Sequence, residues 1–272
     1  MAIFLRTWSS RSLRGTVDLW FAAYPRLLPS AAAISECRLI AHRGWLNGVH
    51  SAAENTRAAF DACLDADIWG IELDIQWTAD GVPMVLHDTD AGRVFGRPDV
   101  QINAVTQRQL VQQCGAIPSL EEVVERYGGK LHLMIEIKRQ TFKRSYAARL
   151  KAVLGELEPV QDYHLLALDP ELFNELDVFP GCTQLPVAEF NAGAMYRLAI
   201  ARGYAGLAGH YLLLNRSMRE GLRRRNMTWG TGYVGSANTL RRELRMGTRW
   251  IFSDHAAALN RALEAMRVAA HQ

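Results

Sequence analysis

Four short clusters of polar residues carry side chains suited to proton transfer, metal binding or phosphate binding. In chain order they are His42-Arg43-Gly44, Glu72-Leu73-Asp74, His87-Asp88 and Glu136-Ile137-Lys138. Histidine is the side chain best suited to proton transfer near neutral pH. Arginine presents a planar fork of donors that matches phosphate oxygens. The clusters therefore indicate acid–base chemistry on an anionic substrate.

The carboxylates of these clusters indicate a bound cation. Glu72 and Asp74 are two residues apart, so on a strand both lie on the same face. Two like charges buried together are costly unless a cation lies between them. Glu136 can supply a third carboxylate, and Lys138 places an ammonium beside it where an anionic substrate needs one. Hard oxygen ligands of this kind suit Mg²⁺ or Ca²⁺ better than zinc.

The elements that must position these clusters alternate along the chain. From residue 38 onward, short apolar runs alternate with segments of helical period, which is typical of parallel strands joined by helices. The expected strands are 39–42, 71–75, 131–138, 164–168, 184–188, 204–208, 227–231 and 250–253. The expected helices are 55–66, 119–127, 143–157, 170–176, 193–202, 217–225, 237–246 and 256–268. Eight such units in roughly 230 residues predict one TIM (β/α)8 barrel over residues 38–272. A doubly wound sheet gives the same alternation, but no G-x-G-x-x-G follows any expected strand.

One segment departs from this alternation and predicts a hairpin after the second strand. Asp80-Gly81 lies between two strand-like runs, which is a strong hairpin signal. If these two residues form the turn, His87 returns opposite Asp74, with an uncertainty of a residue or two because Pro83 lies in the returning arm. The hairpin is expected to bring a histidine back to the carboxylates.

Residues 1–37 form an expected N-terminal helical extension, with an amphipathic helix over 12–24. One interpretation is that it covers the amino-terminal end of the barrel. The alternative is weak peripheral attachment to an anionic membrane surface through residues 12–28.

We expect a cytoplasmic protein, because no apolar run is long enough for a membrane span and no signal peptide is recognisable. The four cysteines form no C-x-x-C pair, and a net charge of +3 gives no reason to expect a nucleic-acid partner.

The ordered set of motifs resembles the glycerophosphodiester phosphodiesterase family over about residues 39–138. Besides the four clusters, the resemblance rests on Glu54-Asn55-Thr56, Thr78-Ala79-Asp80-Gly81 and Pro118-Ser119-Leu120-Glu121-Glu122. It continues more thinly through residues 167–172 and the closing 250–254. The resemblance implies a TIM barrel, one divalent cation, and cleavage of glycerophosphodiesters to sn-glycerol 3-phosphate and an alcohol. It also suggests that the glycerol 2-hydroxyl attacks first and that water then opens a cyclic phosphate.

Carried over residue by residue, the resemblance assigns a role to each cluster. The metal ligands are Glu72, Asp74 and Glu136; the general acid–base pair is His42 and His87; and the phosphate contacts are Arg43 and Lys138. Asn55 or Thr56 is expected to cap the first helix, or else to contact substrate.

Two departures and several alternatives bear on the substrate. Ala53 replaces the usual proline, and the family's Trp-Thr-Val-Asn becomes Gly230-Thr231-Gly232-Tyr233, which puts substrate preference in doubt. His210 can line the pocket, whereas His132 and His164 are expected to be packed inside strands.

The partner is expected to be a small glycerophosphodiester or a lysolipid. A lipid-directed phosphodiesterase, of the lysophospholipase D or sphingomyelinase-D-like kind, is an alternative on the same barrel. A catalytically silent binding barrel is another.

Overall fold

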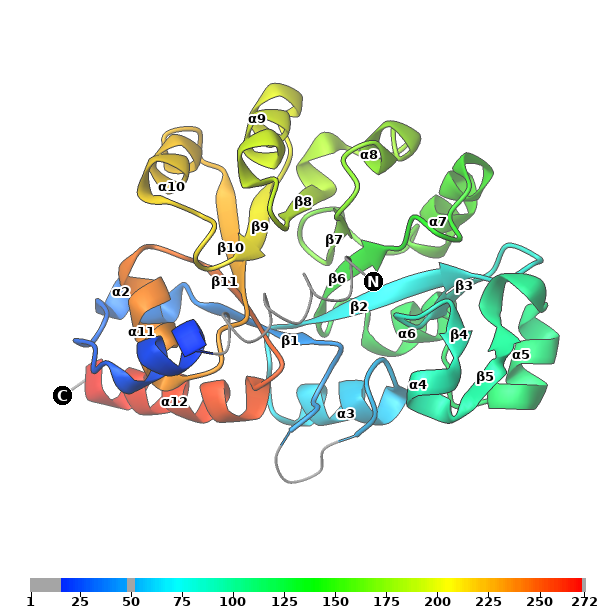
Figure 1. Ribbon diagram of the computed structural model, residues 1–272, viewed down its shortest axis with the longest axis horizontal. Coiled ribbons are helices and arrows are strands. Elements are labelled where there is room, and N and C mark those ends of the chain that lie inside the picture. The colour runs from blue at the N-terminus through cyan, green and yellow to red at the C-terminus, as the bar shows by residue number, and fades with distance from the viewer. Residues whose placement is uncertain (1–15, 48–51, 271–272) are drawn as a thin grey trace.

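The structure, a computed structural model, describes residues 16–47 and 52–270. Eight parallel strands close into a barrel in the order β1-β11-β10-β9-β8-β7-β6-β2, and β1 also pairs with β2 (Figure 1). These strands are β1 (Arg38–His42), β2 (Gly70–Trp77), β6 (His132–Ile137), β7 (Tyr163–Ala167), β8 (Gln184–Ala188), β9 (Gly206–His210), β10 (Thr228–Gly232) and β11 (Trp250–Ser253). The TIM barrel predicted from the alternation is confirmed. Each expected strand lies within about two residues of an observed one.

The helices that follow the strands surround the barrel. They are α3 (Arg57–Asp65), α6 (Leu120–Tyr127), α7 (Ala147–Val153), α8 (Leu172–Glu175), α9 (Ala192–Arg202), α10 (Arg216–Arg223), α11 (Ala237–Arg245) and α12 (Ala256–Ala270). Short 3-10 turns η2 (Arg144–Tyr146) and η3 (Gly181–Thr183) precede α7 and β8. All eight expected helices are present. The expected helix 143–157 is shortened to a 3-10 turn followed by α7.

The strands separate an outer apolar layer from the barrel interior by their period of two. On β6, Leu133, Ile135 and Ile137 belong to the large core shared with the surrounding helices. Met134 points the other way and packs inside the barrel with Ile40, Leu166 and Phe252. Glu136 is in phase with Met134, so the same alternation carries its carboxylate into the barrel at the carboxyl end of the strand.

The predicted hairpin is present, but its register differs by one residue. Strand β3 (Pro83–Val85) pairs antiparallel to β2 with Ile75 opposite Val85 and Trp77 opposite Pro83. The turn has three residues rather than two, because Thr78 pairs with Val82, donating its backbone N–H to the Val82 carbonyl at 3.1 Å. Gly81 within the turn has a φ of +72° and donates its backbone N–H to the carbonyl of Thr78. Leu86, and not His87, therefore donates a backbone hydrogen bond to Asp74, at 3.0 Å.

The segment between the hairpin and α6 forms a small insertion that the alternation did not predict. It contains β4 (Asp90–Ala91), α4 (Gly92–Phe95), β5 (Arg97–Gln101), the 3-10 turn η1 (Ile102–Ala104) and α5 (Gln107–Cys114). It has its own apolar cluster, which includes Val100, Ile102 and Leu110. The insertion lies at one end of the molecule, on the right in Figure 1. Its elements are too short to show a clear hydrophobic period.

The N-terminal extension lies partly at the carboxyl ends of the barrel strands. Residues 12–15 of the expected helix lie outside the described residues, and residues 16–23 are helical. Phe21 contacts the ring of Tyr211, which follows the carboxyl end of β9, with the ring centroids 5.6 Å apart. The interpretation that this helix covers the amino-terminal end is therefore wrong for residues 16–23. Helix α2 (Ala31–Ser35) precedes β1 and packs against α12. No helix within the described residues is long and apolar enough to cross a membrane.

Candidate active site

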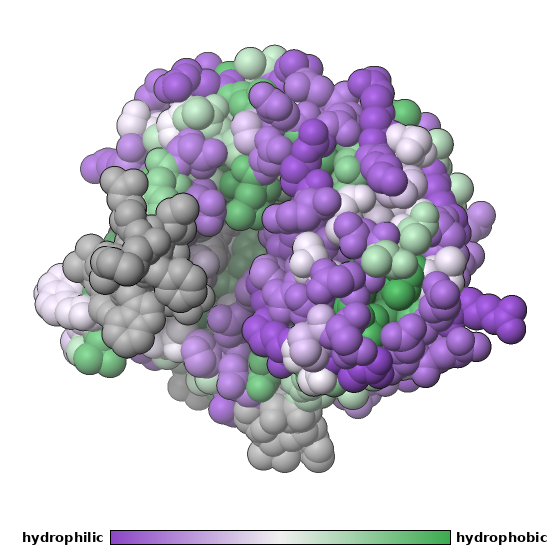
Figure 2. Space-filling model, turned by 45° about the vertical axis from the view of Figure 1, so that its right-hand side comes forward, coloured by the Kyte–Doolittle hydropathy of each residue, from purple (hydrophilic) through white to green (hydrophobic). Residues whose placement is uncertain are grey.

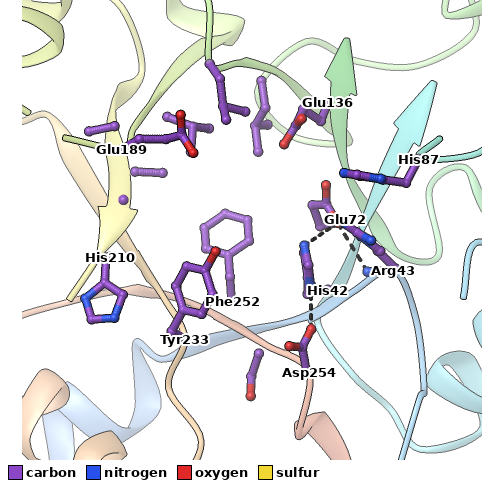
Figure 3. Close-up of a pocket in the computed structure, with 18 of the residues that line it drawn as sticks. His42, Arg43, Glu72, His87, Glu136, Glu189, His210, Tyr233, Phe252 and Asp254 are labelled. Carbon is purple, nitrogen blue, oxygen red and sulfur yellow. Dashed lines mark hydrogen bonds and ion pairs between the residues drawn. The ribbon is translucent and has the colours of Figure 1, made fainter. Parts of the chain in front are cut away.

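A cavity of about 270 Å³ opens at the carboxyl ends of the barrel strands. One side carries charged residues of the sequence clusters, and the opposite side carries Tyr233, Phe252, His210 and Glu189 (Figure 3). The apolar part of the wall includes Leu166, Leu168, Val187 and Leu213. Figure 2 shows a hollow in the molecular surface in which hydrophobic residues are exposed, with hydrophilic residues around much of it. The cavity is thus polar on one side and apolar on the other.

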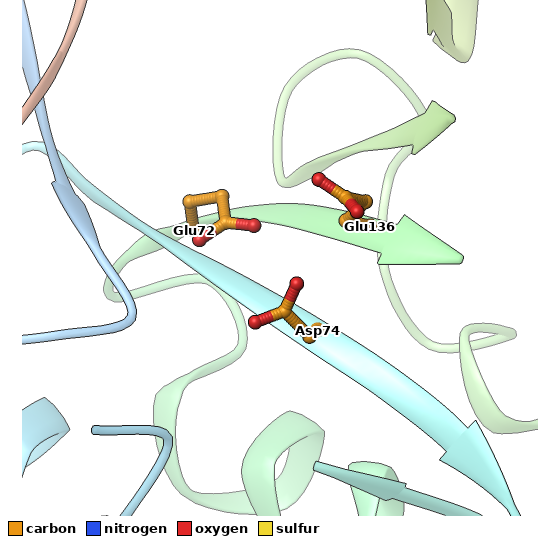
Figure 4. Close-up of side chains that lie close together, drawn as sticks. All are labelled: Glu72, Asp74 and Glu136. Atoms are coloured by element: carbon orange, nitrogen blue, oxygen red, sulfur yellow. The ribbon is translucent and has the colours of Figure 1, made fainter. Parts of the chain in front are cut away.

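The three carboxylates predicted as metal ligands lie together. Asp74 on β2 is the direct neighbour of Glu136 on β6, and Glu72 lies on the same face of β2 (Figure 4). Ligand oxygens of the three residues all lie within 4.8 Å of one another. Burial, together with the nearby charge of Asp74, raises the pKa of Glu72 to about 8. Among the described residues, Oε1 of Glu72 has no hydrogen-bond partner. A buried carboxylate oxygen without a donor, beside two further carboxylates, fits a divalent cation.

Lys138 and Arg43 lie against this acidic cluster. Lys138 Nζ lies 2.6 Å from Oδ1 of Asp74 and also contacts Glu136. Arg43 Nε lies 3.2 Å from Oδ2 of Asp74, and its Nη1 lies 3.0 Å from Glu54. Burial opposes ionisation of Asp74, but the two cations outweigh burial and lower the pKa of Asp74. Both cationic side chains also line the cavity, so they reach an anion bound there.

His42 is held between two carboxylates. Its Nδ1 lies 2.5 Å from Oδ1 of Asp254, and its Nε2 lies 3.7 Å from Oε2 of Glu72. Burial disfavours the charged imidazolium, but Glu72 and Asp254 outweigh burial and raise the pKa of His42 to about 9. Since Nδ1 is engaged by Asp254, Nε2 is the nitrogen that faces the acidic cluster and the cavity.

His87 is placed by the hairpin and forms a second imidazole–carboxylate pair. Its Nδ1 lies 2.7 Å from Oδ1 of Asp88, and its backbone carbonyl accepts a 2.7 Å hydrogen bond from Gln76. Asp88 is in turn fixed by Arg93, whose Nε lies 2.6 Å from Oδ2. The structure therefore brings His87 to the same cavity as Glu72 despite the changed register.

Two residues position the site through contacts that the sequence did not predict. Asp254 follows β11 and engages His42, and a carboxylate at the carboxyl end of a barrel strand is a sequence signal that could have identified it. Asn55 donates from Nδ2 to Oδ2 of Asp74 at 2.9 Å and adopts a positive φ of 56°. Thr56 caps α3 by accepting from the backbone N–H of Ala59 at 3.3 Å. The capping prediction is confirmed for Thr56, while Asn55 supports an expected metal ligand.

The remaining candidate residues from the sequence lie either in the cavity wall or buried in the protein core. His210 and Tyr233 line the cavity on its far side, and their rings lie 5.0 Å apart. Tyr233 has a φ of 63°, which is unusual for a residue other than glycine. His132 and His164 are buried away from the cavity and hydrogen-bond to each other at 2.8 Å, as the prediction of packed histidines requires.

Comparison with known proteins is consistent with this fold. YhdW of Bacillus subtilis, named for glycerophosphodiester phosphodiesterase activity, is 27% identical over 235 residues, covering 80% of this chain and 94% of YhdW. Bovine glycerophosphodiester phosphodiesterase 1 is 46% identical over 54 residues, which are 20% of this chain and 15% of the bovine protein. A glycerophosphodiester phosphodiesterase structure from Thermotoga maritima superposes with a TM-score of 0.71 at 22% identity, covering 83% of this chain and 97% of that chain.

A structure of an Oleispira antarctica phosphodiesterase in complex with the product sn-glycerol-3-phosphate has a TM-score of 0.67 and is 21% identical. The match covers 85% of this chain and 99% of that chain. The fold and the site define a TIM-barrel enzyme with a polar pocket at the carboxyl ends of its strands. Residues 42–164 match the sequence model of the Glycerophosphoryl diester phosphodiesterase family.

Proposed function

We propose that the protein hydrolyses glycerophosphodiesters to sn-glycerol 3-phosphate and an alcohol. The observation that carries this proposal is the convergence of three carboxylates, two imidazole–carboxylate pairs and two cations on one cavity. An acidic cluster for a divalent cation, with Arg and Lys beside it, suits a phosphate diester better than a neutral substrate. The names of the relatives support the same substrate class.

Glu72, Asp74 and Glu136 would hold one divalent cation, Mg²⁺ or Ca²⁺. When bound, the cation supplies Lewis-acid stabilisation of the negative charge that develops on the phosphate. Asn55 keeps the carboxylate of Asp74 oriented toward the other two. Arg43 and Lys138 neutralise the phosphate oxygens, exchanging part of their contact with Asp74 for contact with the substrate.

His42 and His87 transfer the protons. The glycerol 2-hydroxyl attacks phosphorus while one histidine accepts its proton and the other protonates the oxygen of the departing alcohol. Water then opens the resulting cyclic phosphate with the proton transfers reversed. Asp254 and Asp88 each engage a Nδ1 atom, which fixes the rings and leaves both Nε2 atoms for these transfers.

The test is release of sn-glycerol 3-phosphate from a panel of glycerophosphodiesters by the purified chain. We expect activity with Mg²⁺ or Ca²⁺, loss in excess EDTA, and recovery when the cation is restored. Glu72→Gln keeps the shape of the side chain but removes a charge, so it is expected to reduce kcat by at least about 10²-fold and to weaken metal binding measured by calorimetry. Full activity in EDTA would remove the cation from the proposal. Inactivity on the whole panel would remove the substrate class.

The apolar side of the cavity favours a second candidate, cleavage of a lysolipid. Leu166, Leu168, Val187 and Leu213 provide surface for hydrocarbon that a glycerol or sugar head group does not need. Release of choline from lysophosphatidylcholine micelles, measured beside release of glycerol 3-phosphate from glycerophosphocholine, separates the two activities. The substrate with the higher kcat/KM identifies the function.

A further inference from the structure

A continuous row of aromatic rings connects the N-terminal segment to the cavity. Trp20 lies 5.7 Å from Tyr24 and 5.0 Å from Phe21, measured between ring centroids. Phe21 contacts Tyr211 at 5.6 Å. Tyr211 stacks on His210 at 4.5 Å, and His210 lies 5.0 Å from Tyr233 in the cavity wall. The segment is therefore fixed beside the opening of the site.

Polar contacts hold the same segment in place. The Tyr211 hydroxyl donates to the carboxylate of Asp18, and Asn238 of α11 donates to the carbonyl of Ala22 at 2.6 Å. Arg242 of α11 lies over the ring of Phe21, 4.8 Å from its centroid. These contacts bury one face of residues 16–23. They leave the opposite face to solvent.

The solvent-facing side of this segment is unusually apolar. The exposed fractions are 74% for Leu19, 59% for Trp20, 53% for Tyr24 and 72% for Leu27. Isolated exposed apolar residues are ordinary, but a group of them beside a substrate cavity marks an interaction surface.

The charges at this surface are positive. Within residues 16–47 and 52–270, neither Arg26 nor Arg241 forms an ion pair with a carboxylate. Arg26 lies over the ring of Tyr24, 4.5 Å from its centroid, and Arg241 hydrogen-bonds to Asn238. The one acidic residue of 16–28, Asp18, is turned inward to Tyr211. Exposed Leu, Trp and Tyr beside two half-buried arginines that form no ion pair with the described carboxylates match an anionic phospholipid surface, where aromatic rings lie at the level of the head groups.

We propose that residues 16–28 dock the protein on an anionic phospholipid surface and hold the cavity opening near it. The proposal deepens the proposed function, because the substrates of that function are fragments of phospholipids. The docked segment would lie in the plane of the membrane–water interface, so docking requires no membrane-spanning helix.

The experiment is co-sedimentation of the full chain with vesicles of phosphatidylcholine mixed with phosphatidylglycerol, without substrate or turnover. We expect binding that weakens at high salt and is weaker on pure phosphatidylcholine. The variant Leu19→Ser/Leu27→Ser should lower the partition coefficient about tenfold or more, because each leucine buries apolar surface in the interface. The matched control Val111→Ser/Val178→Ser changes exposed valines away from this surface and should bind like the wild type.

A second variant tests the charge separately. Arg26→Gln/Arg241→Gln should remove the preference for phosphatidylglycerol while hydrolysis of soluble glycerophosphocholine stays unchanged. The proposal is overturned if the wild type does not bind the anionic vesicles at low salt, or if Leu19→Ser/Leu27→Ser binds like the valine control. It is also overturned if the chain self-associates without vesicles and the leucine variant is monomeric, since the surface would then be an interface between two copies. An inactive but vesicle-binding protein would contradict only the proposed function.

Discussion

At the scale of single residues, the site depends on pairing each histidine with a carboxylate. His42 and Asp254 are 212 residues apart in sequence, yet their Nδ1 and Oδ1 atoms lie 2.5 Å apart. Asn47 also donates to the backbone carbonyl of Asp254 at 2.6 Å, which fixes the loop after β11. We expect Asp254 to act as a positioning residue, because its carboxylate engages Nδ1 of His42 and leaves Nε2 toward the cavity.

Replacing Asp254 by Asn should reduce kcat with little change in KM. The amide still fills the space, but it can stabilise the wrong tautomer of His42, so proton transfer at Nε2 slows by about 10²-fold or more. The pH profile of kcat should also change shape, which a merely structural role would not produce. Asp65→Asn, an exposed change at the end of α3 and outside the cavity lining, is the matched control. Equal kcat in the two variants would contradict a positioning role for Asp254.

At the scale of elements, the hairpin after β2 delivers His87 to the site. Its three-residue turn needs Gly81 at φ +72, and a Cβ at this position would lie 2.8 Å from Cε1 of Tyr146. That tyrosine stacks on Trp77, with the rings 4.7 Å apart, so it cannot move freely. The turn and the neighbouring 3-10 segment therefore fix each other.

Gly81→Ala should destabilise the fold more than Gly96→Ala, which is its matched control. Both glycines have a φ near +70°, but a Cβ at Gly96 meets nothing within 4 Å. The backbone strain of a left-handed alanine costs about 1 kcal/mol in each variant. The contact with Tyr146 adds about 1 kcal/mol or more in Gly81→Ala alone. Urea unfolding measures the difference, and equal values would show that the ring moves without cost.

A buried ion pair joins α10 to α11 on the side of the barrel next to the N-terminal segment. Arg219 Nη2 lies 2.9 Å from Oε2 of Glu243, and both side chains are almost fully buried. Thr248 hydrogen-bonds to both residues, at 2.7 Å and 3.0 Å. The network fixes α11, on which the N-terminal segment rests.

Glu243→Gln should lower the free energy of unfolding by about 3 kcal/mol, because it leaves a buried guanidinium without its counter-charge. Thermal or urea unfolding measures the loss. Glu220→Gln on the exposed face of α10 is the control and should leave stability unchanged. Equal stability of the two variants would contradict this prediction and would mean that water solvates the guanidinium of Arg219.

At the scale of the whole molecule, acid stability should depend on the barrel interior. His132 donates from Nδ1 to the carbonyl of Gln161 at 2.9 Å, so its Nε2 accepts from Nδ1 of His164 and both rings are neutral. Trp69 stacks on His132 at 4.3 Å. Burial lowers the pKa of His132 to about 4 and that of His164 to about 3, from the ordinary 6.5.

The unfolded chain therefore binds more protons than the folded chain between pH 6.5 and about 4. In this window the free energy of unfolding should fall as pH falls, by about 1.4 kcal/mol per pH unit for each histidine. Urea unfolding across the window measures the slope. The double variant His132→Gln/His164→Leu should have a shallower slope, whereas His255→Gln at an exposed position should keep it. An unchanged slope in the double variant would assign the acid sensitivity to other groups.

The sequence by itself determined the barrel and the residues of its polar side, because both are encoded locally. The alternation of strand and helix periods marks each unit, and the two-residue spacing in Glu72-Leu73-Asp74 assigns both carboxylates to one face whatever lies around them. The hairpin was likewise readable from Asp80-Gly81, although the three-residue turn shifted its register by one.

Only the tertiary structure decided the contacts that depend on closing the barrel. The pairing of β1 with β11 brings Asp254 to His42, and the loop before α3 brings Asn55 to Asp74. It also decided that residues 16–23 lie beside Tyr211 near the cavity, and that His87 lines the same cavity as Glu72 although the hairpin register differs by one residue. Such contacts join residues far apart in sequence, and no local period records which distant segments will meet. The residues on the polar side of the site could therefore be predicted from the sequence. The residues that position them, and the apolar side of the cavity, depend on the closed barrel.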